Sequence, residues 1–528
     1  MKYFNKLTIS SVILTLLISI PALLILVNLF TPTTENWEHL KDTVLSEYIF
    51  NSLFIMVGVA LMTSIIGFST AYITTMYSFT FSKFYHYALI LPFAIPTYIV
   101  SYVYAGMFDI TGSVTMFILE LLGKENVTEV YFMDIMSIEG AIIVMSLVLY
   151  PYVYLISKTY LIAESSSIIE ASKTMGFSSW QIFTKVIIPI SRPAIVAGTI
   201  LAVMEAVADY GVVDYYGVPT FVTGIFKTWY GMGSVEDASK LASMLMMFIF
   251  ILIFLEKFQR RNKRYRSSGK DFAPISKIVL KGKSNIFASI FCFLPVFFGF
   301  ILPFTQMSYW FLLSYKDVID EDFLRILMQT LSLGIAGSII ITLLAFVFVY
   351  NVRIHANKIS DYLTQITKLG YSIPGAVVAV GVLNFFSIID GYFDILLSGS
   401  VVAILFAYCV RFLAISINNY ESGFSKIPQT YDDACKTMNI SQSHKLRKVI
   451  FPLIKNAAFA SFIIVFIEII KELPLTMILR PFNFDTLAVY SHELVGQAQV
   501  YESSVPAMFI VLLGIISVLV LARKMIKD

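Results

Sequence analysis

The sequence predicts an all-α polytopic membrane protein with about 12 transmembrane helices, arranged as two parallel repeats of six. Composition carries the first part of this prediction, because 58% of the 528 residues are hydrophobic and only 14% are charged, with a mean hydropathy of +0.79. Soluble proteins carry about 25% charged residues. A chain this apolar is most simply explained by a surrounding bilayer. The second part comes from a polar stretch that occurs twice, at matching places between apolar runs.

The apolar runs define six candidate spans in each half of the chain. A transmembrane helix needs about 20 mostly apolar residues. The first run follows Lys2 and Lys6 but is too long for the core of a signal peptide, so we expect it to be a span. The expected spans lie near 9–30, 49–73, 86–107, 139–157, 194–208 and 240–258, then near 286–307, 327–350, 369–389, 397–415, 457–471 and 505–522.

The positions of lysine and arginine predict the orientation of these spans, because these residues concentrate on the cytoplasmic side. Segment 31–48 contains four acidic residues and one lysine, and segment 108–138 is also acidic, so both are expected outside. Segment 259–285 contains nine Lys or Arg and one acid. We interpret it as a topology anchor and basic cytoplasmic linker, in preference to a segment that recognises nucleic acid or lipid, and expect the chain to contact membrane lipid but no nucleic acid. Both termini are then cytoplasmic.

A duplicated segment shows that the chain is a tandem repeat. Residues 170–189 (EASKTMGFSSWQIFTKVIIP) and 433–452 (DACKTMNISQSHKLRKVIFP) share nine identities at an offset of 263, where chance gives roughly one. Farther upstream, Ile95-Pro96 aligns with Ile373-Pro374 at an offset of 278, which places 15 extra residues in loop 108–138. The predicted domains are therefore a first six-span unit 1–258, the linker 259–285 and a second six-span unit 286–528.

An even number of spans per repeat means that both repeats enter the membrane in the same direction. The repeats are then parallel and related by an axis along the membrane normal. Both copies of the polar stretch must lie on one side of the membrane, and the charge distribution makes this the cytoplasmic side.

The first polar stretch has the pattern of a helical elbow. Ser167-x-x-Glu170 is a capping box that should start a short helix. Gly176 should end it, because glycine adopts the left-handed conformation of a helix C-terminus. Ser178-x-x-Gln181 is a second capping box, and Pro189 should end the second helix by removing a backbone donor.

The second polar stretch repeats this design. Thr430-x-x-Asp433 should start the first helix, Asn439 replaces the glycine, and Pro452 should end the second helix. Asparagine also tolerates the left-handed turn. Such an elbow can be a simple interfacial loop, but two copies with preserved turn chemistry favour a docking surface for a symmetric cytoplasmic partner.

These stretches resemble the "EAA" loop of permeases from binding-protein-dependent ABC importers, here 164–192 and 427–455. The resemblance implies a type I ABC importer permease fold, in which each loop forms a coupling helix in a groove of the ATPase subunit. Ile188 also fits the pattern, whereas Asn439 departs from it. The ATPase-coupling residues implied are Glu170, Ala171, Gly176, Pro189, Asp433, Ala434, Asn439 and Pro452.

No pattern in the chain indicates an enzyme. The sequence has no Gly-x-x-x-x-Gly-Lys-[Ser/Thr] loop, no His-Glu-x-x-His pair and no nucleophile elbow. Its three cysteines, Cys292, Cys409 and Cys435, match no metal spacing. We therefore expect no cofactor on this chain, with ATP and Mg on a partner ATPase.

Acidic residues gather after the fifth span of each repeat. Acids at membrane depth are costly and usually serve a pathway or a partner. With nearby tyrosines such as Tyr215 and Tyr216 they suit a hard trivalent cation, but they equally suit helix capping and an aromatic belt, and no metal ligands are assigned. The residues expected to line or gate a translocation path are Glu205, Asp209, Tyr210, Asp214, Glu468, Glu472 and Asp485.

The segments DYGVVDYYGVPTFVTGIF and KELPLTMILRPFNFDTLA resemble the fused permeases of ferric iron importers. The resemblance implies a multi-pass protein of the bacterial inner membrane that passes ferric iron, two copies of an ABC ATPase, and a periplasmic or lipid-anchored solute-binding protein. Sister permeases for thiamine, polyamines or phosphonates share the layout. An ion-coupled secondary transporter and a non-transporting membrane scaffold are the alternatives from other classes. Pro96 and Pro374 are candidate hinges or simple kinks.

Overall fold

The computed structural model describes residues 6–32, 34–127, 134–261, 277–355 and 358–527. Within these residues, 11 helical segments are long and apolar enough to cross a membrane, and Val500–Ile516 is a shorter apolar helix. Each of them corresponds to one of the twelve expected spans. The all-helical, polytopic prediction is confirmed.

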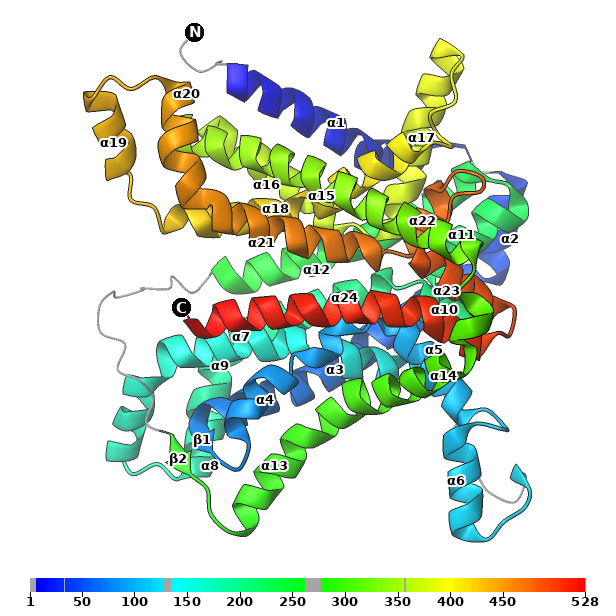
Figure 1. Ribbon diagram of the computed structural model, residues 1–528, viewed down its shortest axis with the longest axis vertical. Coiled ribbons are helices and arrows are strands. Elements are labelled where there is room, and N and C mark those ends of the chain that lie inside the picture. Colours follow the sequence, from blue (N-terminus) through cyan, green and yellow to red (C-terminus); the bar gives the residue numbers. More distant parts are fainter. Residues whose placement is uncertain (1–5, 33, 128–133, 262–276, 356–357, 528) are drawn as a thin grey trace. The chain divides into compact units, whose positions relative to one another are not determined.

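The secondary structure follows the order shown in Figure 1. In the first half the elements are α1 (Lys6–Asn28), α2 (Glu35–Thr43), α3 (Leu45–Met76), β1 (Tyr77–Ser78), α4 (Ser82–Ala88), η1 (Leu91–Ala94), α5 (Thr97–Phe108), α6 (Ser113–Leu122), α7 (Ile138–Thr174), α8 (Ser179–Gln181), η3 (Ile182–Ile187), α9 (Ile188–Ala208), α10 (Gly211–Tyr215), α11 (Phe221–Phe226), η4 (Lys227–Gly231) and α12 (Val235–Arg261). In the second half they are β2 (Ile278–Val279), α13 (Lys283–Val296), η5 (Phe297–Ile301), α14 (Leu302–Val318), α15 (Glu321–His355), α16 (Lys358–Lys368), η6 (Leu369–Ser372), α17 (Gly375–Phe393), α18 (Val401–Ser425), α19 (Thr430–Thr437), α20 (Gln442–Lys445), η7 (Leu446–Ile450), α21 (Phe451–Ile470), α22 (Pro474–Leu479), α23 (Leu487–Gly496) and α24 (Val500–Lys527).

The chain forms two compact units, each built around three long helices. In one, called here the α3 unit, α3, α7 and α9 pack against one another. In the other, the α15 unit, the equivalent helices α15, α18 and α21 do the same. The two cores have the same construction, as a duplication predicts.

Small residues bring the helices of each core close together, as they do in other membrane bundles. In the α3 unit, Gly67 and Gly198 both face Val153, and a Cβ added at either glycine would lie 2.6 Å from an atom of that valine. In the α15 unit, Ser416 and Ser461 occupy the positions of Val153 and Gly198, and their hydroxyl oxygens are 2.5 Å apart. The core helices thus approach closely in both repeats, through glycines in the first repeat and through a serine–serine hydrogen bond in the second.

Hydrogen bonds at equivalent positions support the repeat alignment. The Ser52 hydroxyl accepts from Phe221 N at 3.3 Å, and Thr330, its equivalent at the offset of 278, accepts from Leu487 N at 2.9 Å. These bonds join the second span of each repeat to the second short helix after the fifth span, which is α11 in the first repeat and α23 in the second.

The first span of each repeat packs on the core of the other repeat. Within the α15 unit, α1 contacts α16 and α17. Within the α3 unit, the span formed by α13, η5 and α14 contacts the core of the first repeat, because α13 contacts α3 and η5 contacts α7. The compact units are therefore not identical with the two sequence repeats, whose boundaries at 1–258 and 286–528 stay a prediction.

The prolines expected within the third spans lie at helix starts instead. Pro96 immediately precedes α5 and Pro374 immediately precedes α17, and the residue before each proline is extended. Proline disfavours helical geometry at the preceding residue but is well suited to the start of a helix. Each third span therefore begins just after the proline. In the first repeat this start is about ten residues beyond the start of the apolar run. Neither proline kinks a continuous helix.

The basic linker 259–285 lies largely outside the described residues. Its described end forms β2, which pairs in parallel with β1, and Leu280 N donates to Ser78 O at 2.9 Å. Lys277 donates to Thr74 O at 2.9 Å. The end of the linker is thus attached to the α3 unit, near the end of α3.

Candidate functional site

Both elbows contain the left-handed turn that the sequence predicts. Gly176 has φ of 80° and Asn439 has φ of 50°. In the first elbow Phe177 N donates to Ser172 O at 3.2 Å, and in the second Ile440 N donates to the equivalent carbonyl, that of Cys435, at 3.0 Å. A bond of this span closes a helix by the Schellman motif. Asn439 therefore preserves the geometry of the glycine that it replaces.

The second arm of the first elbow begins as predicted but does not end at Pro189. Ser178 and Gln181 form a reciprocal capping box. The helix then passes through the π-helical segment η3 and continues as α9, with Pro189 in its first turn. A π turn absorbs the missing donor and the ring of a proline without breaking the helix. The prediction that Pro189 terminates the helix is wrong.

Pro452 has the same role in the second elbow, so the corresponding prediction is also wrong. The chain runs from α20 through the π-helical segment η7 into α21, and Pro452 lies in the first turn of α21. Phe451 N donates to Leu446 O, as Ile188 N donates to Phe183 O in the first repeat. Each elbow is therefore joined through a π turn to a span without a break in the helix.

The first arms of the two elbows differ from each other. In the first repeat α7 runs without a break to Thr174, so the predicted helix start at Ser167 is wrong. In the second repeat α18 ends at Ser425 and a separate helix, α19, begins at Thr430 without a side-chain cap from that residue. Pro428 accounts for the break, because its equivalent in the first repeat is Ser165, which can continue a helix.

Apart from Pro189 and Pro452, the predicted coupling residues lie at these turns or in the helix just before them. Ala171 and Ala434 are exposed, and Asp433 is exposed and paired with Lys436 at 3.2 Å. Glu170 lies in α7, but its side chain is outside the described part of the structure. Large apolar side chains are exposed beside the turns, with Trp180 71% and Met438 72% exposed. Exposed apolar groups on polar elbows are typical of a docking surface.

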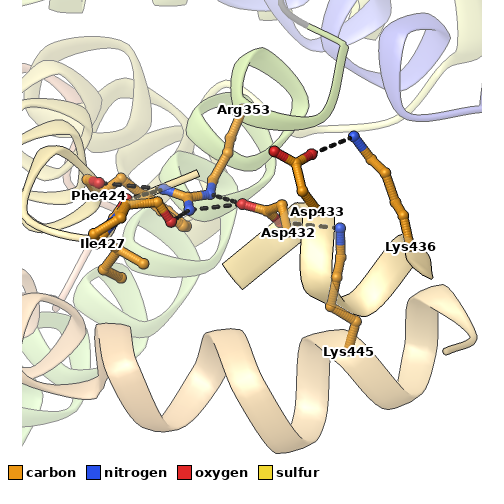
Figure 2. A network of polar contacts seen from close by, with 8 residues as sticks. Arg353, Phe424, Ile427, Asp432, Asp433, Lys436 and Lys445 are labelled. Atoms are coloured by element: carbon orange, nitrogen blue, oxygen red, sulfur yellow. Dashed lines mark hydrogen bonds and ion pairs between the residues drawn. The ribbon is translucent and has the colours of Figure 1, made fainter. Parts of the chain in front are cut away.

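A buried ion network fixes the second elbow to the rest of the α15 unit (Figure 2). Arg353, near the end of α15, contacts Asp432 Oδ2 from Nε at 2.8 Å and from Nη2 at 2.6 Å. Its Nη1 also donates to the carbonyl oxygens of Phe424 and Ile427, both at 3.2 Å. The guanidinium thus joins α15, the end of α18 and the start of α19.

Lys445 completes this network from the second arm. Its ammonium donates to Asp432 Oδ1 at 3.1 Å, so one carboxylate holds both arms of the elbow. Burial alone would raise the pKa of Asp432, but hydrogen bonds from Lys445 and Arg353, and their charges, outweigh burial and lower this pKa below its ordinary value. The carboxylate is therefore charged throughout the physiological pH range.

The first elbow lacks this network. The positions equivalent to Asp432 and Lys445 are Ile169 and Ile182, and the position equivalent to Arg353 is Thr75. Ile182 is buried and belongs to an apolar cluster of the α3 unit. One elbow is therefore held by ions and the other by apolar packing, although their turns have the same geometry.

The acids expected along a translocation path include two helix caps. Asp209 follows α9, accepts from Val212 N at 2.9 Å at the start of α10, and also accepts from the Thr97 hydroxyl. Glu472 is its equivalent at the offset of 263 and accepts from Leu475 N at 3.1 Å at the start of α22. The capping interpretation left open by the sequence is therefore correct for this pair.

The two caps differ in how their charge is compensated. Glu472 is paired with Arg411 at 2.9 Å, whereas the residue of the first repeat equivalent to Arg411 is Val148. Burial raises the pKa of Asp209 to about 6, although hydrogen bonds from Thr97 and Val212 act in the opposite direction. Burial without a lysine or arginine partner thus makes this carboxyl harder to ionise, but it is still mostly charged above about pH 6.

The α3 unit brings Asp214 and Tyr210 together with a residue that the sequence did not indicate, His492. Its Nε2 lies 3.4 Å from Asp214 Oδ2, and its Nδ1 lies 2.5 Å from the hydroxyl of Tyr102. The Tyr210 ring packs against the imidazole at a centroid distance of 5.5 Å. These side chains come from α5, α10, α23 and the residue before α10, and they form one polar cluster.

The remaining predicted path residues have local roles. Glu468 is paired with Lys471 at 2.8 Å, Asp485 is paired with Arg480, and Glu205 lies within α9 in electrostatic contact with Asp209. In the part of the chain that the structure describes, no group of three or more His, Cys, Asp or Glu side chains is arranged to hold a metal ion.

The chain therefore has the features of a membrane transport subunit, namely a duplicated helical bundle with one exposed elbow per repeat. The profile of the family described as "Binding-protein-dependent transport system inner membrane component" matches residues 63–264 and 355–527, and each match contains one elbow. Because the two matches cover more than half of the chain, the chain belongs to this family. It is a multi-pass membrane subunit, a permease, of an ABC importer of the binding-protein-dependent type.

Curated relatives agree with the family. "Fe(3+)-transport system permease protein FbpB 2" of Haemophilus influenzae is 23% identical over 503 residues, which are 94% of this chain and 93% of the relative. "Ferric transport system permease protein FbpB" of Actinobacillus pleuropneumoniae is 23% identical over 79% of this chain and 62% of its own. "Sulfate transport system permease protein CysT" of Escherichia coli is 29% identical over 33% of this chain and 57% of its own.

Proposed function

We propose that this permease forms the transmembrane path of an ATP-driven importer of ferric iron. A solute-binding protein delivers the ion on the outer side, and a separate ABC ATPase, in two copies, holds the two elbows on the cytoplasmic side. ATP and Mg bind to the ATPase, and both termini of the permease are cytoplasmic. The observation that carries the proposal is the pair of elbows with equal turn geometry in the two repeats, beside relatives that align over almost the full chain.

The elbows are suited to transmit force. Each has a closed left-handed turn, exposed apolar side chains and a second arm that continues into a span. When the two ATPase copies close on ATP, each elbow is displaced together with its span. The permease then changes between inward-open and outward-open states, while hydrolysis takes place on the other subunit.

Ferric iron is the substrate that the relatives favour. Proteins whose names specify ferric transport align over 79% and 94% of this chain, whereas the sulfate permeases align over about a third of it. The acidic cluster of the α3 unit also suits a cation better than a sulfate anion, since Asp209 and Asp214 would repel it. Thiamine, polyamines and phosphonates are the alternatives that share this architecture.

Reconstitution tests the proposal. The permease, its ATPase and its solute-binding protein are inserted into proteoliposomes, and uptake of radioactive ferric iron is measured with and without ATP. We expect uptake that requires all three proteins, stops with vanadate and is unaffected by excess sulfate, thiamine, spermidine or phosphonate. Uptake of one of these competitors in place of iron would contradict the substrate. Uptake by the permease alone, driven by an ion gradient, would contradict the ATP-driven class.

A further inference from the structure

His492 lies where polar side chains from three elements of the α3 unit converge. It belongs to α23, whereas Tyr102 lies on α5 and Asp214 on α10. The imidazole is 8% exposed and Tyr102 is 2% exposed, while the Asp214 side chain is 33% exposed. The cluster is therefore buried on the Tyr102 side and open to solvent at the carboxylate.

The two ring nitrogens of His492 have different partners. Nδ1 lies 2.5 Å from the Tyr102 hydroxyl, which fixes the orientation of the ring. Nε2 faces Asp214 Oδ2 at 3.4 Å, too long for a strong hydrogen bond. Two donor atoms that share one metal ion, each about 2.0–2.2 Å from it, lie about 3 Å apart. A histidine that binds a metal is commonly held at its other nitrogen by a hydrogen-bond partner, as His492 is by Tyr102.

The charge around His492 also favours a cation. In the described residues, Asp214 is paired only with His492, and Asp209 accepts hydrogen bonds from Thr97 and Val212 without a lysine or arginine partner. The α15 unit differs here, because Glu472, the equivalent of Asp209, is neutralised by Arg411. Among the described residues that follow the fifth span, the α3 unit thus has two carboxylates, Asp209 and Asp214, without a lysine or arginine partner.

We propose that His492 Nε2 and the Asp214 carboxylate form a transit site for ferric iron on its way through the permease, with Tyr102 as the residue that positions the imidazole. This inference rests on the proposed function, and it names the residues that handle the ion. Carboxylate oxygen and imidazole nitrogen are suitable ligands for iron. The Asp209 charge adds to the attraction without contacting the ion.

Two protein ligands make a weak site, as transport requires. An ion must bind well enough to enter a pathway and weakly enough to leave it. The described residues offer no third His, Cys, Asp or Glu to tighten the site into a storage site. Water or the ion's own chelator fills the remaining coordination positions.

The first experiment measures binding by the full complex of permease and ATPase in nanodiscs, without nucleotide. Gallium(III), a trivalent and redox-inert stand-in for ferric iron, is added as its citrate complex while thermal unfolding is recorded. A ligand that binds the folded state raises the unfolding temperature with its concentration. We expect this increase in the wild type and its loss in His492→Gln and Asp214→Asn. Asp214→Glu should restore part of it, because the carboxylate is retained.

Two further variants test whether the gallium effect depends on the orientation of the imidazole and whether loss of any nearby carboxylate would abolish it. Tyr102→Phe keeps both ligands but frees the ring, so the gallium concentration for half the effect should rise about tenfold. Glu139→Gln removes one exposed carboxylate of the same unit at the start of α7 and should change nothing. A merely structural His492–Asp214 contact would lower the unfolding temperature in the variants but would leave the gallium-dependent increase intact. That result would overturn the inference.

The second experiment measures iron transported per ATP hydrolysed in proteoliposomes. His492→Gln and Asp214→Asn should reduce this ratio about tenfold or more, with stimulation of the ATPase by the binding protein retained. If the wild type transports iron and both variants transport it equally well, the transit site is refuted while the proposed function stands. If the wild type transports no iron, the proposed substrate itself fails. If one variant does not assemble, the other and Tyr102→Phe carry the same comparison.

Discussion

Arg353 and Asp432, 79 residues apart in the chain, form a buried ion pair at 2.6 Å that connects the end of α15 with the first helix of the second elbow. Lys445 contacts the same carboxylate from the second arm at 3.1 Å. The first elbow has threonine and two isoleucines at these three positions. The two elbows thus share one turn geometry but are attached to their units by different forces.

Removing one member of this network should destabilise the protein and loosen the second elbow. Asp432→Asn leaves Arg353 and Lys445 without a counter-ion, and breaking a buried pair costs about 3–5 kcal/mol. We expect a lower unfolding temperature in detergent and less uptake per ATP hydrolysed. Asp322→Asn, which breaks an exposed pair with Arg325, is the matched control and should have little effect.

Replacing the whole network should be much milder than breaking it. The triple variant Arg353→Thr, Asp432→Ile, Lys445→Ile installs the residues of the first repeat, and apolar replacement of a buried ion group is often neutral or stabilising. We expect its unfolding temperature to exceed that of Asp432→Asn. A triple variant less stable than the single variant would show that the three charged side chains stabilise the protein by more than the neutralisation of one another's charge.

The left-handed turns predict opposite effects of two substitutions. Gly176→Val should cost about 1–2 kcal/mol and uncouple transport, because a β-branched residue resists φ of 80°. The cause is the backbone alone, since a Cβ at Gly176 would contact nothing within 4 Å. Asn439→Gly should leave transport intact. The measurements are uptake and co-purification of the ATPase, and wild-type values in Gly176→Val would contradict the coupling role of the turn.

The Asp209 carboxyl should give stability a distinct pH dependence. Its pKa is about 6 in the folded protein, above the ordinary value, so between about pH 4 and pH 6 the folded state binds more protons than the unfolded state. Stability should therefore fall by about 3 kcal/mol as pH rises through this window and then level off. Asp209→Asn should flatten this part of the profile and be at least as stable as the wild type at pH 7.5. If stability depended on pH in the same way in Asp209→Asn, another titrating group would be responsible for that dependence.

Sequence patterns predicted those parts of the structure that depend on neighbouring residues. The spans, the turns at Gly176 and Asn439, and the capping box at Ser178 follow from composition and from backbone preferences, which act over a few residues. The effects of Pro189 and Pro452 were predicted wrongly, because a π turn upstream of a proline leaves no clear signal in sequence. The first-repeat helix start at Ser167 failed because the chain there has no proline to interrupt α7.

The ion network and the His492 cluster depend on distant contacts, so no local pattern indicates them. Arg353 looks like an ordinary charge at the end of a span, and Tyr102 is 390 residues from His492. One signal was available, however. Arg411 is the only charge in the apolar run 397–415, and a lone charge within a span usually has a buried partner. Alignment of the two repeats places Val148 opposite Arg411. This contrast would have indicated that the Glu472 cap has an arginine partner and that the Asp209 cap does not.

Side-specific labelling tests the central claim most directly, which is that two equivalent elbows face the cytoplasm and are held there by an ATPase. Trp180→Cys and His444→Cys introduce thiols at exposed positions of the two elbows, in a background from which the three native cysteines have been removed. A membrane-impermeant maleimide should label both variants in inside-out vesicles, neither in right-side-out vesicles, and both less strongly when the ATPase is bound. Labelling of the two positions from opposite sides of the membrane would contradict the account.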